Sequence, residues 1–305
     1  MVIMSSKPID ISGFRHLYPF KSHYMDLKGL KYHYLDEGRG NPLLMLHGNP
    51  TWSFYYRELI KALGGHYRCI VPDHMGCGLS DRPPLKTYDY RLKTRVDDVD
   101  ALMNALTFDT KITLVLHDWG GMIGMAWALR HPEKIGRLVI LNTAAFLPPC
   151  QKRIPLRLSV IRRFTALAAP AVLGLNLFAV AALYMASYKG LDREVKKALT
   201  APYNSWQNRI ATLKFVQDIP LAPGDPSYEL ARQTDEGLAV FSKLPTLICW
   251  GQHDFVFDQS YLDEWQRRFP EAEVHSFAEA GHYVLEDVPE KIISRVQDFL
   301  QRHPL

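Results

Sequence analysis

Short apolar runs alternate with longer stretches of helical periodicity along most of this chain. Six of the runs are rich in β-branched and aliphatic residues and predict buried strands at residues 43–47, 68–74, 112–118, 137–142, 246–251 and 273–277. Such alternation is typical of βαβ units that feed a parallel sheet. Two further runs, 22–27 and 30–38, flank Lys28 and Gly29 and predict an antiparallel hairpin at the sheet edge. We therefore expect an α/β fold with an eight-stranded, mostly parallel sheet.

The strand pattern is interrupted once, between Asn142 and Thr246, where helical patterns take its place. We interpret this segment as a helical cap, residues 146–225, inserted into a core made of residues 1–145 and 226–305. The chain shows no internal repeat and no low-complexity linker. The sequence thus predicts one α/β domain that carries an insertion.

Within the cap, the run from Phe164 to Ser187 has no charged residue and is long enough for a membrane span. A single crossing would separate the last two strands from the strands with which they must pair, so topology argues against a span. Pro170, Gly174 and Asn176 indicate two short helices instead. The run either lines a large apolar pocket or lies in part on a membrane.

Basic residues without an acid among them precede this run: Lys152, Arg153, Arg157, Arg162 and Arg163. They suit an anionic lipid surface or an acidic partner. A solvated helix face explains them equally well.

Composition limits the classes of function. The chain has 305 residues, of which 47% are hydrophobic, and this is enough for a large core. A formal net charge of +4 is too small and too dispersed to indicate nucleic acid, so a small or lipid-like substrate fits better. The N-terminus has no signal-peptide pattern, and Cys69, Cys77, Cys150 and Cys249 show no Cys-x-x-Cys spacing. We expect reduced thiols and a cytoplasmic protein.

The candidate chemistry begins where the 112–118 strand ends at Asp118 and runs directly into a helix opened by Gly120 and Gly121. A sharp strand-to-helix turn presents one side chain above the carboxyl end of the sheet, where open α/β folds bind ligands. Taken alone, Asp118 could equally be a helix N-cap.

Two distant residues favour catalysis over capping. Asp254 follows the 246–251 strand, and His282 lies in the loop after the 273–277 strand, which gives the chain order nucleophile, acid, base. An ionised Asp118 needs no proton removed and can displace a leaving group at carbon to form an ester. In the usual version, His282 oriented by Asp254 then activates a water, and the backbone N–H groups of Trp119 and Asn49 form the oxyanion hole.

The motifs HGNPTW (residues 47–52) and HDWGG (117–121), with the Asp254 and His282 pair, resemble the haloalkane dehalogenase branch of the α/β-hydrolase fold. By this resemblance Asn49 and the Trp119 indole N–H hold a departing halide or a developing carboxylate. No metal or cofactor is implied.

Epoxide hydrolases share the HDWG motif and give an alternative. They typically have an aromatic residue where this chain has Asn49, and they need two cap tyrosines to protonate the epoxide. Tyr184, Tyr188 and Tyr203 are the candidates for that role.

Nearly the whole chain is similar to one offshoot of the dehalogenase branch, the β-lactone decarboxylases of bacterial long-chain olefin biosynthesis. The stretches that carry this similarity are HGNPTWSFYYREL, RCIVPDHMGCGLSDRP, LNTAAF, APYNSWQNRIATLKFVQDIPL and ICWGQHDFVFD. The resemblance implies a cis-3,4-dialkyl-β-lactone substrate, cleaved to a cis-alkene and CO₂. It also implies a multi-enzyme assembly with a β-lactone synthetase and, in the same pathway, a thiolase-like condensing enzyme and a reductase.

The uncharged cap run independently suggests a substrate with two alkyl chains, because burial stabilises each CH₂ by about 0.8 kcal/mol. A strained lactone has a carboxylate leaving group at its β-carbon, comparable to the halide of an alkyl halide, so Asp118 could serve either reaction. Attack at the β-carbon or at the lactone carbonyl, and water activation by His282, remain open at this point. Haloalkane dehalogenation is the alternative activity, and a non-catalytic receptor for a lipophilic ligand is the alternative without chemistry.

Overall fold

A single mixed sheet organises the molecule in the computed structural model, which describes residues 9–149, 154–164 and 168–305. The strand order is β1-β2-β4-β3-β5-β6-β7-β8, and β2 runs antiparallel to both of its neighbours while all other pairs are parallel. The strands are β1 (Ser22–Leu27), β2 (Leu30–Glu37), β3 (Asn41–Leu46), β4 (Tyr67–Pro72), β5 (Ile112–Asp118), β6 (Ile135–Thr143), β7 (Thr246–Gly251) and β8 (Glu273–Phe277). The expected α/β fold with eight strands is confirmed.

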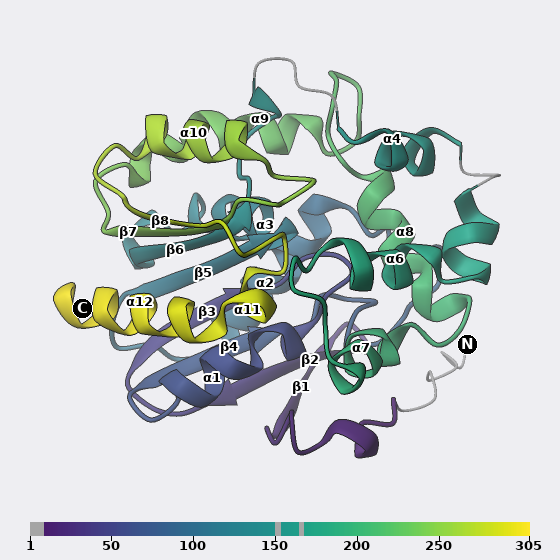
Figure 1. Cartoon of the computed structure of the whole chain (residues 1–305), viewed down its shortest axis with the longest axis horizontal. Coiled ribbons are helices and arrows are strands. Elements are labelled where there is room, and N and C mark those ends of the chain that lie inside the picture. The colour runs from purple at the N-terminus through teal and green to yellow at the C-terminus, as the bar shows by residue number, and fades with distance from the viewer. Residues whose placement is uncertain (1–8, 150–153, 165–167) are drawn as a thin grey trace.

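Helices cover both faces of the sheet (Figure 1). In the core they are α1 (Arg57–Leu63), α2 (Leu92–Ala105), α3 (Trp119–Ala128), α9 (Tyr228–Gly237), α10 (Gln259–Arg268), α11 (Val284–Asp287) and α12 (Pro289–Arg302). In the segment between β6 and α9 they are α4 (Leu156–Arg163), the π-helical turn η5 (Pro170–Gly174), α6 (Leu177–Met185), α7 (Arg193–Thr200) and α8 (Ile210–Gln217).

Two apolar cores result from the alternation of side chains along each strand. On β3, Leu44 and Leu46 join the core under α2, α3 and α10, whereas Leu43 and Met45 join the core under α1 and α12. Because β5 lies between two covered faces, all of its residues are buried. The apolar runs that form β5, β6 and β7 are therefore strands with two buried faces, whereas β8 at the sheet edge is mostly half-buried.

The hairpin at the sheet edge has the predicted turn. Leu27 pairs with Leu30, and Lys28 and Gly29 have φ values of 56° and 85°. Two consecutive positive φ values are those of a type I′ turn, whose twist matches that of the two strands.

The uncharged run does not form one helix. Leu175 and Asn176 separate η5 from α6, and Asn176 has a left-handed φ of 56°. No helix in the described parts of the chain is both long and apolar enough to span a membrane. Lys152, Arg153 and Cys150 of the earlier expectations lie outside the described residues, as do residues 165–167 of the run. The cap limits of 146–225 stay a prediction.

Candidate active site

Asp118 occupies the sharp turn between β5 and α3. Its φ of 51° and ψ of −126° are rare for a residue with a side chain, and such backbone costs on the order of 1–3 kcal/mol. The turn fits only because residues 120 and 121 are glycines: a Cβ on Gly120 would overlap the Leu46 carbonyl oxygen, and one on Gly121 would overlap the Thr143 hydroxyl. The two glycines thus let α3 begin against β3 and β6, which places the Asp118 side chain at the end of the sheet.

The two carboxylate oxygens of Asp118 have different partners. Oδ1 accepts hydrogen bonds from the backbone N–H groups of Asn49 at 3.0 Å and Trp119 at 2.5 Å. Oδ2 lies 3.3 Å from Nε2 of His282. The side chain therefore does accept the capping bond from Trp119, but it also reaches the imidazole, so capping and the triad arrangement coexist.

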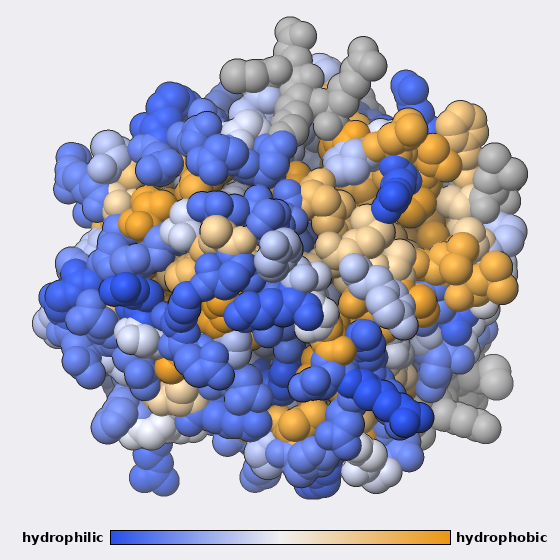
Figure 2. Space-filling model, viewed as in Figure 1, coloured by the Kyte–Doolittle hydropathy of each residue, from blue (hydrophilic) through white to orange (hydrophobic). Residues whose placement is uncertain are grey.

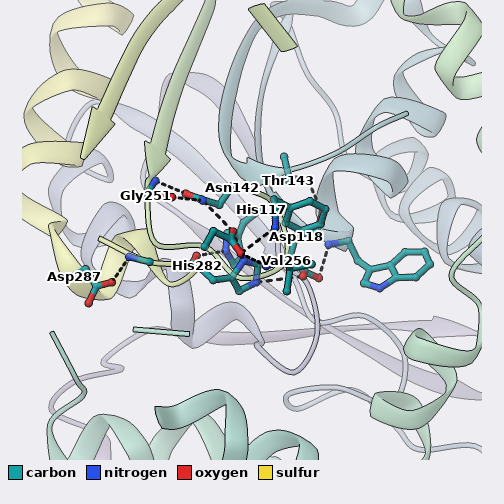
Figure 3. Close-up of polar contacts among 12 residues, drawn as sticks. His117, Asp118, Asn142, Thr143, Gly251, Val256, His282 and Asp287 are labelled. Atoms are coloured by element: carbon teal, nitrogen blue, oxygen red, sulfur yellow. Dashed lines mark hydrogen bonds and ion pairs between the residues drawn. The ribbon is translucent and has the colours of Figure 1, made fainter. Parts of the chain in front are cut away.

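His282 contacts both acids, and Figure 3 shows it beside Asp118. Its Nδ1 donates to Oδ2 of Asp254 at 2.8 Å, and Oδ1 of Asp254 accepts from the backbone N–H groups of Val256 at 2.7 Å and Phe257 at 3.0 Å. All three triad side chains are buried. Residues 118, 254 and 282 thus form one hydrogen-bonded chain at the carboxyl end of the sheet.

Electrostatic interactions determine the protonation states of Asp118 and His282. Burial would raise the pKa of Asp118, but the hydrogen bond and charge of His282 outweigh it and hold the pKa below its usual 3.8. Burial would lower the pKa of His282, but Asp254 and Asp118 outweigh it and raise the pKa to about 10. At neutral pH the resting site therefore contains an imidazolium beside the Asp118 carboxylate.

Asn142 is a part of the site that the sequence reasoning missed. Its side-chain N–H₂ donates to Oδ2 of Asp254 at 3.0 Å and to the Gly251 carbonyl at 3.1 Å, and its Oδ1 accepts from the Gly251 N–H at 2.8 Å. It stands near the end of β6 with a φ of 36°. The amide holds Asp254 as an acceptor for His282 and links β6 to the loop after β7.

His117 was also missed. Its Nε2 donates to the backbone carbonyl of His282 at 2.9 Å, and burial holds the pKa of His117 down to about 3, so the ring is neutral. His117 and Asn142 end adjacent parallel strands, and polar residues at those ends were the available signal.

Asp287 connects the His282 loop to the end of α6. Its carboxylate accepts hydrogen bonds from the Gly281 N–H at 2.8 Å, the Ser187 hydroxyl at 2.6 Å and the Tyr188 N–H at 2.9 Å. A backbone bond of 2.7 Å from Tyr283 to Ala186 lies beside it. The loop that carries the imidazole is thereby attached to a helix of the cap.

A cavity of about 870 Å³ opens onto Asp118 and His282. Its wall is almost entirely apolar, with few polar groups besides Asn49, Asp118 and His282. The cap run contributes Ala171, Val172, Leu177, Phe178, Ala181, Ala182, Met185 and Ala186. The uncharged run therefore lines the pocket, which is one of the two roles predicted for it.

Asn49 and Trp119 both line this cavity. The Asn49 side-chain N–H₂ donates to the Thr212 carbonyl at 3.0 Å, which engages one of its two hydrogens and leaves the second available. The Trp119 ring packs 5.4 Å from the ring of Phe215. Their side chains are thus positioned by α8.

The three tyrosines considered for epoxide chemistry lie elsewhere. Tyr184 and Tyr188 are exposed, and the buried Tyr203 donates its hydroxyl to the Thr51 carbonyl at 3.2 Å. None of them lines the cavity, whose tyrosines are Tyr261 and Tyr283. Among the residues that the structure describes, no group of three or more acidic, histidine or cysteine side chains could hold a metal ion.

Known proteins share this architecture. A family model described as the alpha/beta hydrolase fold matches residues 41–289. The chain is 52% identical over 289 residues to the cis-3-alkyl-4-alkyloxetan-2-one decarboxylase of Shewanella oneidensis, covering 93% of this chain and 89% of that protein. It is 42% identical to the protein of the same name from Xanthomonas campestris pv. campestris, with coverage of 94% and 98%. The crystal structure of haloalkane dehalogenase DatA from Agrobacterium tumefaciens superposes with a TM-score of 0.81 at 26% identity, covering 93% and 97%.

Proposed function

The chain belongs to the α/β-hydrolase fold family, and from this premise we propose that it is a decarboxylase of cis-3,4-dialkyl-β-lactones, which are oxetan-2-ones. The observation that carries the proposal is the large apolar cavity that opens onto an ionised, histidine-paired Asp118. The cavity suits two alkyl chains. Two relatives of this chain are named oxetan-2-one decarboxylases, and their names favour a β-lactone as the substrate. Assembly with a β-lactone synthetase remains a prediction from the resemblance.

In the first step, Oδ2 of Asp118 attacks the β-carbon of the lactone. The bond from this carbon to the ring oxygen breaks, its electron pair goes to the oxygen, and the former ring carbonyl becomes a free carboxylate. The two backbone N–H groups that would stabilise an oxyanion at an attacked lactone carbonyl already bind Oδ1 of Asp118. Their engagement supports attack at the saturated carbon. Asn49 and the Trp119 indole then act as donors to the new carboxylate.

In the second step, the Asp118 ester fragments. The carbon–carbon bond to the carboxylate breaks and releases CO₂, its electron pair forms the alkene, and the ester carbon–oxygen bond breaks to restore the Asp118 carboxylate. No water and no proton are consumed. Inversion in the first step followed by anti fragmentation in the second preserves the cis arrangement. The imidazolium of His282 stabilises Asp118 as it departs, and Asn142 keeps Asp254 in place behind it.

The test supplies the protein with a cis-3,4-dialkyl-β-lactone and, separately, with a series of 1-bromoalkanes. We expect equal amounts of cis-alkene and CO₂ from the lactone, measured by gas chromatography, and far slower bromide release. Asp118→Asn serves as the matched blank in both reactions. Bromide release without alkene formation would overturn the proposal in favour of haloalkane dehalogenation.

Turnover of the lactone in H₂¹⁸O distinguishes fragmentation of the Asp118 ester from its hydrolysis by water. Hydrolysis of an Asp118 ester by water at the ester carbonyl would leave ¹⁸O in the Asp118 carboxylate, whereas fragmentation leaves it unlabelled. Mass spectrometry of the peptide that contains Asp118 measures this. We expect no incorporation, and labelling in proportion to turnover would refute the fragmentation step.

A further inference from the structure

The cap helix α6 is apolar on two sides. Phe178, Ala181 and Met185 face the cavity, whereas Val180 and Tyr184 lie outside it and are 38% and 69% exposed. A helix that is hydrophobic all round is normally covered all round. The outward side of α6 therefore lacks the cover that its sequence predicts.

Neighbouring segments extend this surface. We define the outer cap face as Phe164, Leu175, Val180, Tyr184 and Trp206, all of which are exposed and none of which lines the cavity. Leu175 is 70% exposed, and the Trp206 ring lies beside Gly174, which adjoins Leu175. Figure 2 shows hydrophobic residues gathered over the cap on the right of the molecule.

The segment that carries most of this face has positively charged residues but no negatively charged ones. Residues 150–190 contain no acid. Arg163 at the end of α4 is exposed. Lys196 of α7, a helix that also carries Glu194, lies over the Tyr184 ring at 4.5 Å. Arg162 is neutralised by Asp225 at 2.5 Å and does not count toward this charge. An apolar face with exposed Trp, Tyr and Arg side chains is the composition that binds the interface of an anionic bilayer.

The cavity wall continues onto the same surface. Leu156, Val160 and Leu177 line the cavity and are also exposed, so apolar side chains lead from the outside to the pocket. An alkyl chain moving along them remains in apolar contact. This continuity favours a lipid surface over an acidic protein as the occupant, because a protein partner would need no such path.

We propose that the outer cap face binds peripherally to an anionic lipid bilayer, and that alkyl chains pass from the bilayer into the cavity over Leu156, Val160 and Leu177. The docking is independent of the reaction. The transfer of alkyl chains rests on the proposed function.

Vesicle co-sedimentation tests the docking without any substrate. The full chain is mixed with vesicles of phosphatidylcholine alone or with phosphatidylglycerol added, at low and high salt. We expect binding to the anionic vesicles that weakens with salt. The double variant Leu175→Glu/Tyr184→Glu is expected to lower the partition coefficient at least tenfold. Val240→Glu, at an exposed position outside the cap, is the matched control and is expected to bind normally.

Folding and activity are checked on the same proteins. Neither Leu175 nor Tyr184 lines the cavity, so both variants are expected to keep their melting temperature and their rate on a short-chain, water-soluble lactone. Wild-type protein that stays in the supernatant, or a double variant that still binds, would refute the docking. Wild-type self-association in sedimentation velocity that the double variant abolishes would assign the face to a second copy instead. Failure of the lactone reaction would leave the vesicle result unchanged.

Discussion

Asp118→Asn is expected to lower the rate of lactone decarboxylation by at least about 10⁴-fold. The amide oxygen of asparagine can still accept from the Asn49 and Trp119 N–H groups, so the turn and the hydrogen bonds of Oδ1 persist. What is lost is the anionic Oδ2, because an amide nitrogen does not displace a carboxylate at carbon. Gas chromatography of the alkene under single-turnover conditions measures the loss.

The asparagine variant also controls for folding. Since it keeps the shape of the side chain but removes the charge that pairs with His282, we expect a folded protein with a melting temperature somewhat below that of the wild type and with substrate binding retained. A rate within tenfold of the wild type would show that Asp118 does not bear the reacting oxygen, and the first step would then have to be abandoned.

His282→Gln is expected to lower the steady-state rate by about 10³-fold while trapping the covalent ester. Without the imidazolium at 3.3 Å, Oδ2 of Asp118 is a stronger nucleophile but a poorer leaving group. Ester formation is therefore retained and fragmentation slows. Intact-mass spectrometry should show the protein plus the entire lactone, with no atom lost. A dehalogenase-type intermediate from a bromoalkane would instead add the alkyl group alone.

The pH dependence of the reaction rate provides the control for His282→Gln. Asp254 and Asp118 raise the pKa of His282 to about 10 against the effect of burial, so its cation is present below that pH and is lost above it. The pKa of Asp118 lies below 3.8, so the nucleophile is ionised throughout the neutral range. We expect a flat wild-type profile at neutral pH with a fall near pH 10, and no such fall in His282→Gln. A rate that climbs between about pH 6 and pH 8 would instead indicate a neutral histidine base.

The sequence predicted the sheet well because burial leaves a simple pattern. β7 has the predicted limits because it is a fully buried run. β8 also has the predicted limits, although it is mostly half-buried, because turn residues bound it. The approach of Asp118, Asp254 and His282 was also accessible, because the carboxyl ends of parallel strands meet at one edge of a sheet. The break after β5 was predicted from the glycines that follow it.

Other features depend on three-dimensional neighbours that no local pattern encodes. Asn142 had the residue type of an ordinary strand-end turn, and only the closeness of β7 makes its amide a partner of Asp254. Tyr203 was a fair candidate for the cavity by its place in the cap, yet it packs inward against the Thr51 carbonyl. The Asn49 amide is likewise held by Thr212, which is 163 residues away in the chain.

The attachment of α6 to the loop of His282 through Asp287 has a consequence for chimeras. Grafting a foreign cap onto this core would break the three hydrogen bonds that Asp287 accepts from Ser187, Tyr188 and Lys189 unless the graft reproduces the 186–189 turn. Asp287, buried with fewer hydrogen-bond donors, would then disturb the loop that carries His282 in the chimera. In this architecture an exchange of the cap therefore changes both the substrate range and the catalytic rate. A grafted cap should be transferred together with residues 281–287.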